Sequence, residues 1–282
     1  NISSNRRSYN KFVANEMMED FALRFTARRA RKWPYARIAG TALGIVSFMV
    51  LEAIGGAITL NYGFVNAAWA IAALVAVIFI SGLPISYYAA RYGVDIDLLS
   101  RGAGFGYVGS TIASLIYASF TFIFFALEAA IMSMALELLL GIPLYIGYAI
   151  SALIVLPLVT HGIAYISRFQ VWSQPVWLVL QLIPLFYVFT HPQSSLQEWL
   201  QFEGGAGSAA GSFNILLFGG ASAVLMSLVA QIGEQADILR FLPPKAENGS
   251  PAKWWTALLM AGPGWIVFGA GKLFLGSYLA FL

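Results

Sequence analysis

The sequence predicts an all-α polytopic membrane protein, and three observations carry that prediction. Apolar residues make up 59% of the 282 residues and charged residues only 10%, whereas soluble domains carry about 25% charged residues. The mean hydropathy is +0.75. Apolar runs of about 20 residues recur along the chain, and each is long enough to cross a bilayer as a helix. The chain has no cysteine, which excludes disulfide frameworks and cysteine-bound metals.

The first 37 residues are expected to form a cytoplasmic, basic, amphipathic segment in front of the membrane domain. They hold nine of the sixteen Lys and Arg residues. Residues 15–34 are predicted to be one helix, because Asn15 suits its N-cap and Pro34 ends it. We expect this helix to lie on anionic lipid, where each basic residue contributes about 1 kcal/mol. No nucleic-acid role is expected.

Residues 38–282 are expected to form a transmembrane domain of about seven helices. The expected spans are 38–60, 67–90, 107–140, 143–165, 171–190, 213–236 and 254–280. Because the chain begins with Asn and stops within an apolar run, we expect it to be part of a longer protein whose C-terminal region is missing here.

Apart from Lys272 inside span 7, the basic residues outside the first segment follow the second, fourth and sixth spans. They are Arg91, Arg101, Arg168, Arg240, Lys245 and Lys253. The loops after the first, third and fifth spans contain no Lys or Arg. The positive-inside rule therefore places the N-terminus in the cytoplasm of a multi-pass protein of the inner (plasma) membrane.

Small residues and proline interrupt three of the spans. Gly55-Gly56 lies in span 1, Gly219-Gly220 and Gly233 in span 6, and Gly262-Pro263-Gly264 in span 7. Interrupted spans in corresponding halves mark the midplane site of many transporters, whereas small residues also let membrane helices pack closely. Both readings stay open for Gly55-Gly56, and packing is favoured in span 7.

Three carboxylates lie well inside the expected spans: Glu52, Glu128 and Glu234. Each costs at least about 2.5 kcal/mol in apolar surroundings, so each should face a cavity or a partner. Glu52 and Glu128 are expected at similar depth, where they could hold a cation, a proton or the N–H groups of a solute. Glu234 lies nearer the cytoplasmic end, and a purely structural role is equally open for it. Lys272 could pair with a carboxylate, but snorkelling towards the membrane surface is favoured.

Other patterns carry little chemistry. The stretch GAGFG at 102–106 lacks the spacing of a dinucleotide loop. His161 and His191 lack metal-ligand spacing. No nucleophile–base arrangement is visible, so neither an enzyme nor a bound metal or organic cofactor is expected.

Three segments resemble the nucleobase:cation symporter-1 family, the purine, cytosine, allantoin and hydantoin permeases. SRGAGFGYVGS at 100–110 is similar to the family's Arg-x-x-Phe-Gly-x-x-Gly element, with one extra residue in the spacing, and GLPISYYAARYG at 82–93 is similar to the segment before it. EQADILRFLPP at 234–244 is similar to the Asp-x-x-Arg-Tyr motif, with Phe241 in place of Tyr. The motif residues are Arg101, Phe105, Gly106, Gly109, Asp237 and Arg240.

The resemblance implies a fold of two inverted five-helix repeats, with spans 1 and 6 broken around the site. This chain would hold the first repeat and spans 6 and 7. The family's sodium site lies between spans 1 and 8, so half of it would lie outside this chain.

The resemblance also implies substrate-binding positions. Phe124 falls on a ring-stacking Trp, Glu128 on a Gln that bonds the ring edge, Glu234 on an Asn and Leu228 on a second stacking Trp. Glu52 would bind substrate or the coupling cation, which would be Na⁺ or H⁺. Because two amides have become carboxylates and both Trp residues are replaced, a cationic or N–H-rich solute is favoured over a neutral nucleobase.

The favoured function is cation-coupled secondary transport of a small nitrogenous solute, nucleobase-like or cationic. The alternative is the transporter-like, ligand-sensing membrane domain of a bacterial histidine kinase, with signalling domains following at the C-terminal side. A structural scaffold has little support, because buried carboxylates are costly without a use.

Overall fold

The structure is a computed structural model that describes residues 23–282 except 191–195, 206, 208–210 and 246–249. In that part of the chain the regular structure is helical, with no strand. Five helical segments are long and apolar enough to cross a membrane, and a sixth is added if one bent pair counts as a single span. The chain is therefore a multi-pass, all-helical membrane protein.

Most helices follow the expected ranges, but the number of spans differs from the expected seven, because the helix at Leu144–Thr160 has only 17 residues and is shorter than a full span. Span 1 comprises α2 (Tyr35–Leu43), η1 (Gly44–Ser47) and α3 (Val50–Tyr62), and span 2 is α4 (Phe64–Tyr92). A short α5 (Ile96–Ser100) and η2 (Arg101–Phe105) lead into α6 (Gly106–Leu140), which is span 3. Then come α7 (Leu144–Thr160), α8 (Ile163–Thr190) and α9 (Leu196–Leu200). Span 6 comprises α10 (Ile215–Leu225), η3 (Met226–Gln231) and α11 (Ile232–Leu239), and span 7 comprises α12 (Pro251–Ala261) and α13 (Trp265–Phe281).

The basic N-terminal segment differs from its prediction. Residues 15–22 lie outside the described part, and residues 23–33 form turns rather than helix. Arg31 is buried, and its guanidinium donates to the carbonyl oxygens of Ala90 and of Leu242, the latter at 3.1 Å. The amide of Thr26 donates to the carbonyl of Gly93 at 2.7 Å. These bonds fasten the segment to the C-terminal ends of α4 and span 6.

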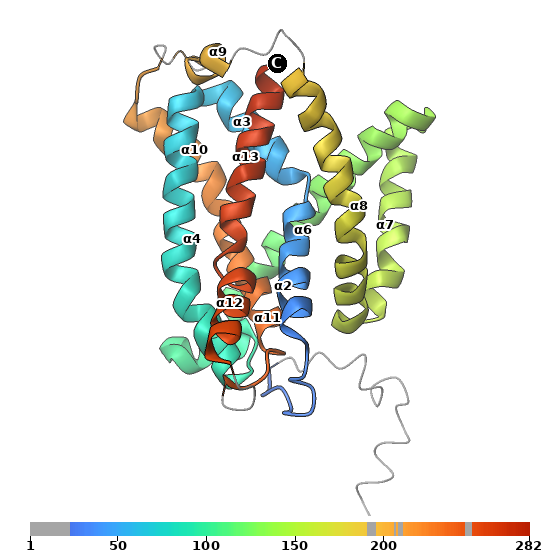
Figure 1. Ribbon diagram of the computed structural model, residues 1–282, viewed down its shortest axis with the longest axis vertical. Helices are drawn as coiled ribbons and strands as arrows, with labels where there is room; N and C mark the ends of the chain where they lie inside the picture. The colour runs from blue at the N-terminus through green and yellow to red at the C-terminus, as the bar shows by residue number, and fades with distance from the viewer. Residues whose placement is uncertain (1–22, 191–195, 206, 208–210, 246–249) are drawn as a thin grey trace, which may run out of the picture.

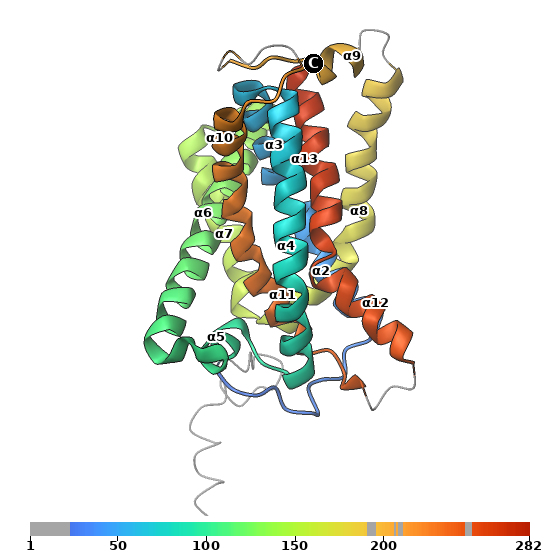
Figure 2. The ribbon, with the colours of Figure 1, turned by 90° about the vertical axis from the view of Figure 1, so that its left-hand side faces the viewer.

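The core lies between α3, α4, span 6 and α13 (Figures 1 and 2). The glycines of α3 and α13 bring these two helices together. A Cβ on Gly55 would lie 1.9 Å from the carbonyl oxygen of Leu273, and a Cβ on Gly276 would lie 2.0 Å from that of Glu52. Gly55-Gly56 therefore serves packing, one of the two readings left open, and the break of span 1 lies elsewhere.

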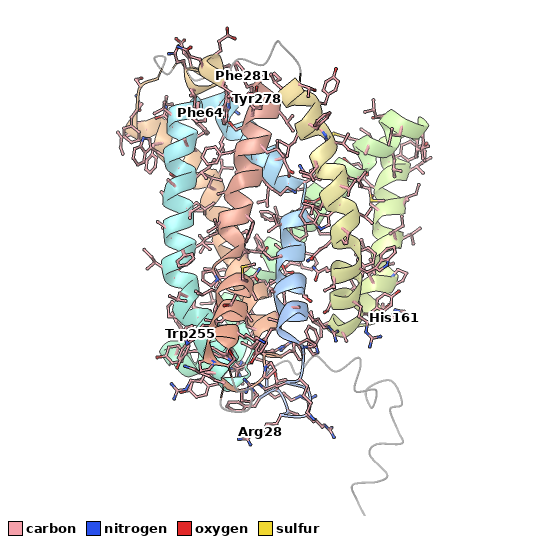
Figure 3. All side chains as sticks on the ribbon, viewed as in Figure 1. Arg28, Phe64, His161, Trp255, Tyr278 and Phe281 are labelled. Carbon is pink, nitrogen blue, oxygen red and sulfur yellow. The ribbon has the colours of Figure 1, made fainter. Side chains whose placement is uncertain are left out.

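The connections that carry the basic residues lie at one end of the molecule. Figure 3 labels Arg28, His161 and Trp255 at that end, with Phe64, Tyr278 and Phe281 at the opposite end. The α4–α5, α7–α8 and α11–α12 connections share the end with Arg28 (Figure 1). The charge asymmetry in the sequence is thus an asymmetry between the two ends of the folded bundle.

Candidate functional site

Span 1 is broken between η1 and α3, and its two halves are bent by 44°. Phe48 has an extended ψ of 126°, which removes its carbonyl from the helical hydrogen-bond pattern. Met49 is the N-cap of α3 and offers no side-chain capping bond. The break therefore exposes a backbone carbonyl at Phe48 and unbonded amides at the start of α3, and buried groups of both kinds need partners.

Glu128 of α6 meets one of these needs. Its Oε1 accepts a hydrogen bond from the Val50 amide at 2.8 Å. A carboxylate at a helix N-terminus also interacts favourably with the helix dipole. Glu128 thus caps α3 from a different span, and a carboxyl group in the apolar middle of α6 has a structural reason.

Lys272 of α13 meets the other need. Its Nζ donates to the carbonyl oxygen of Phe48 at 2.8 Å and lies 3.0 Å from Glu52 Oε1. Gln181 of α8 donates to the same Oε1 at 2.9 Å, while Glu52 Oε2 has no hydrogen-bond partner among the described residues. Lys272 is only 6% exposed. The expectation that Lys272 snorkels is therefore wrong, because its ammonium is held inside the bundle by an ion pair and a backbone carbonyl.

The expectation that Glu52 and Glu128 lie close in depth agrees with this geometry. Glu52 is in the first turn of α3, and Glu128 bonds the first residue of that turn. Lys272 interacts electrostatically with both carboxylates. Three charged side chains from three spans therefore converge on one helix break.

Span 6 changes to 3₁₀ geometry at η3, but it continues as one apolar helical span without a sharp bend. A groove of about 780 Å³ runs between one face of α6, residues 224–230 of span 6 and Ile54 of α3. We call it the α6 groove. Its lining is apolar except for the hydroxyls of Ser119 and Ser227, and Phe120 and Phe124 form an aromatic pair in it with ring centroids 4.4 Å apart.

The structure divides the predicted substrate residues among four places. Phe124 lines the α6 groove. Leu228 is buried in the core and does not line the groove. Glu128 and Glu52 lie at the break of span 1. Glu234 lies in the first turn of α11, where Gln231 donates to its Oε2 at 2.5 Å.

The motif residues of span 6 hold the short α5 helix. Asp237 Oδ1 accepts from the Ile96 amide at 3.3 Å, and Arg240 lies 3.6 Å from Asp95. Asp95 in turn caps α5 by accepting from the Leu98 amide at 2.8 Å. These contacts connect the C-terminal end of span 6 to the segment that enters α6.

The motif glycines shape the entry to α6. Gly106 has a φ of +63°, a left-handed conformation that glycine adopts without strain. A Cβ on Gly109 would lie 2.8 Å from that of Phe105, so a glycine there leaves room for the Phe105 side chain. Arg101 donates from Nε to Ser110 Oγ at 3.1 Å and lies over the Tyr107 ring. These six motif residues are thus placed as supports of the helix ends.

Comparison with known proteins adds no relative: no protein-family model, curated protein or solved structure matches this chain. Within the part that the structure describes, no group of His, Asp or Glu residues is placed to hold a metal ion. The function must therefore be argued from the geometry.

Sequence reasoning missed two members of the site. Gln181 was not singled out, although a glutamine in an apolar span has to find a polar partner. The carbonyl of Phe48 was not foreseen, because no glycine or proline marks the residue. The one available signal was Lys272, since a lysine in the middle of a span pairs with another polar group when it is too deep to reach water.

Proposed function

We propose that this chain is a transporter-like membrane domain that binds a small nitrogenous solute in the α6 groove and moves it across the membrane. The observation that carries the proposal is the meeting of one broken span and one irregular span on a single helix. Helix α6 contacts both α3, just after the break of span 1, and the 3₁₀ segment η3 of span 6. Discontinuous helices around a midplane cavity are typical of secondary transporters.

The groove favours an uncharged, planar solute. Its volume of about 780 Å³ lies in the range of small-molecule sites. Phe120 and Phe124 offer aromatic faces, and Ser119 and Ser227 offer hydroxyls. Neither nearby carboxylate is a free counter-ion, because Glu128 caps α3 and Glu52 pairs with Lys272. Of the two solute classes expected from the sequence, the nucleobase-like one fits this groove better than the cationic one.

Thermal-shift measurements on the protein in detergent test this proposal. We expect nucleobases, hydantoins or allantoin to raise the unfolding temperature, since a ligand that binds only the folded state stabilises it, and polyamines to have no effect. Phe124→Ala should abolish the shift, whereas Phe125→Ala, on an exposed neighbour outside the groove, should keep it. Stabilisation by polyamines alone, or a shift that survives Phe124→Ala, would contradict the proposal.

Solute sensing without transport is the second candidate function. The hydrogen bonds of Lys272 and Glu128 to the backbone at the break of span 1 favour this function. A transport cycle that opens the break would have to disrupt these bonds on each turnover. Flux measurements in proteoliposomes separate the two functions. A heterocycle that binds but is not carried across would assign sensing.

A further inference from the structure

The ammonium of Lys272 occupies a position built from cation ligands. It contacts the carbonyl oxygen of Phe48 and Glu52 Oε1, and the second carboxylate oxygen of Glu52 has no partner among the described residues. Carbonyl and carboxylate oxygens are the ligands that hard metal cations prefer. In transporters with broken helices, the unwound carbonyls coordinate the coupling Na⁺. The break of span 1 offers such a carbonyl at Phe48.

Burial holds the Lys272 ammonium in its position beside Glu52 and Phe48. The side chains of Lys272 and Glu52 are 8% and 10% exposed, and α13 is locked against α3 by the close approach of Gly55 and Gly276 to the opposite backbone. Removing one member of a buried ion pair leaves an uncompensated charge. Without Lys272, the Glu52 carboxylate therefore needs another cation or a proton to remain neutral in the bundle.

We propose that Lys272 is the tethered resident cation of this site, so that the domain folds and binds its solute without a free Na⁺. The inference rests on the proposed function for the solute but concerns a different position, the Phe48–Glu52 side of the break. It assigns Lys272 as the residue that decides cation dependence. Neither Na⁺ nor K⁺ then has a place at the break of the wild-type chain.

The experiment compares unfolding temperatures of the full chain in detergent in NaCl, KCl and choline chloride at equal ionic strength, without solute. The wild-type protein should unfold at the same temperature in all three salts. Lys272→Ala removes the ammonium and leaves space, so it should be stabilised by NaCl over choline chloride in a saturable manner. Lys272→Met, which removes the charge but fills the space, is the matched control and should show no difference between the salts.

Four results would overturn the inference. One is a wild-type protein that Na⁺ stabilises over choline. Another is a folded Lys272→Ala variant with no response to Na⁺ or K⁺. If Lys272→Ala does not fold in choline, NaCl during purification should rescue it, and failure of that rescue counts against the inference too. The double variant Glu52→Gln/Lys272→Met removes both charges, so it should fold and unfold at the same temperature in all three salts. Stabilisation of this variant by Na⁺ would show that Na⁺ binds at another position.

Solute binding measured in the same salts distinguishes this inference from the proposed function. A heterocycle that binds only in NaCl would refute the tethered cation and keep the solute site. An absence of solute binding, together with Na⁺-dependent stabilisation of Lys272→Ala, would refute the solute site and keep the tethered cation.

Discussion

Two charged side chains from distant parts of the sequence hold the backbone of span 1 at its break. Lys272 takes the carbonyl of Phe48, and Glu128 takes the amide of Val50. Each contact satisfies a backbone group that an unbroken helix would have satisfied internally. These two side chains therefore stabilise the break of span 1.

The first prediction concerns the contribution of the Glu52–Lys272 ion pair to stability. Glu52→Gln or Lys272→Met alone should destabilise the protein by about 3–5 kcal/mol, because each leaves one buried charge without its partner. The double variant should cost clearly less than the sum of the single ones. Unfolding of all four proteins in the same detergent measures the coupling energy, and strictly additive effects would show that the pair is not coupled.

Glu128 makes the second prediction. Glu128→Ala should destabilise the protein by about 1–3 kcal/mol, since the Val50 amide loses its acceptor in a buried setting. Glu128→Gln keeps an acceptor oxygen and loses only the charge, so it should be milder by about a factor of two or more. Hydrogen exchange of the first α3 amides should speed up in Glu128→Ala and change little in Glu128→Gln; equal exchange in all three proteins would remove Glu128 as a cap.

Helix interruptions decide the arrangement at the scale of the element. Span 1 breaks at Phe48 and Met49, span 6 changes to 3₁₀ geometry at η3 without a sharp bend, and Gly55-Gly56 remains in regular helix. Span 7 turns at 262–264 but still passes as one apolar span. Glycine is compatible with both a helix break and a close helix contact. The atoms around each glycine therefore decide which of the two it serves.

The α3–α13 contact makes the third prediction. Gly55→Ala and Gly276→Ala should each destabilise the protein by about 1–3 kcal/mol or more, because the added methyl group overlaps the backbone of the facing helix. Gly271→Ala on the same α13 is the control, since nothing lies within 4 Å of its Cβ position. It should be neutral or stabilising by up to about 1 kcal/mol. Similar effects of the three substitutions would contradict the locked contact.

The positions of helices were predictable from the sequence, and the partners of the buried charges were not. The apolar runs predict the spans because their lengths match the thickness of the membrane. For example, the span expected at 107–140 corresponds to α6 at Gly106–Leu140. Lys272 and Phe48 are 224 residues apart, and no local pattern encodes such a contact. Residues 23–33 were wrongly expected to be helical because tertiary hydrogen bonds from Arg31 and Thr26 outweigh local helix signals.

The two ends of the whole molecule differ in charge, and this makes the fourth prediction. The α11–α12 end should face the cytoplasm and the α9 end the outside, as the positive-inside rule requires. Because the chain has no cysteine, single substitutions report on this directly. Glu203→Cys should react with an impermeant maleimide in intact cells, and Lys253→Cys only after permeabilisation; the reverse pattern would invert the topology.

The central claim is that the α6 groove is a solute site reached from water, and cysteine reactivity measures it most directly. Ser119→Cys lies in the groove, and Thr121→Cys lies two residues along the same helix outside it. A charged methanethiosulfonate reagent should modify the Ser119→Cys variant at least about tenfold faster, because a thiol facing hydrocarbon is shielded from a charged reagent. Hydantoin or cytosine should slow that reaction. Equal, slow modification of both variants, unchanged by either solute, would contradict the claim.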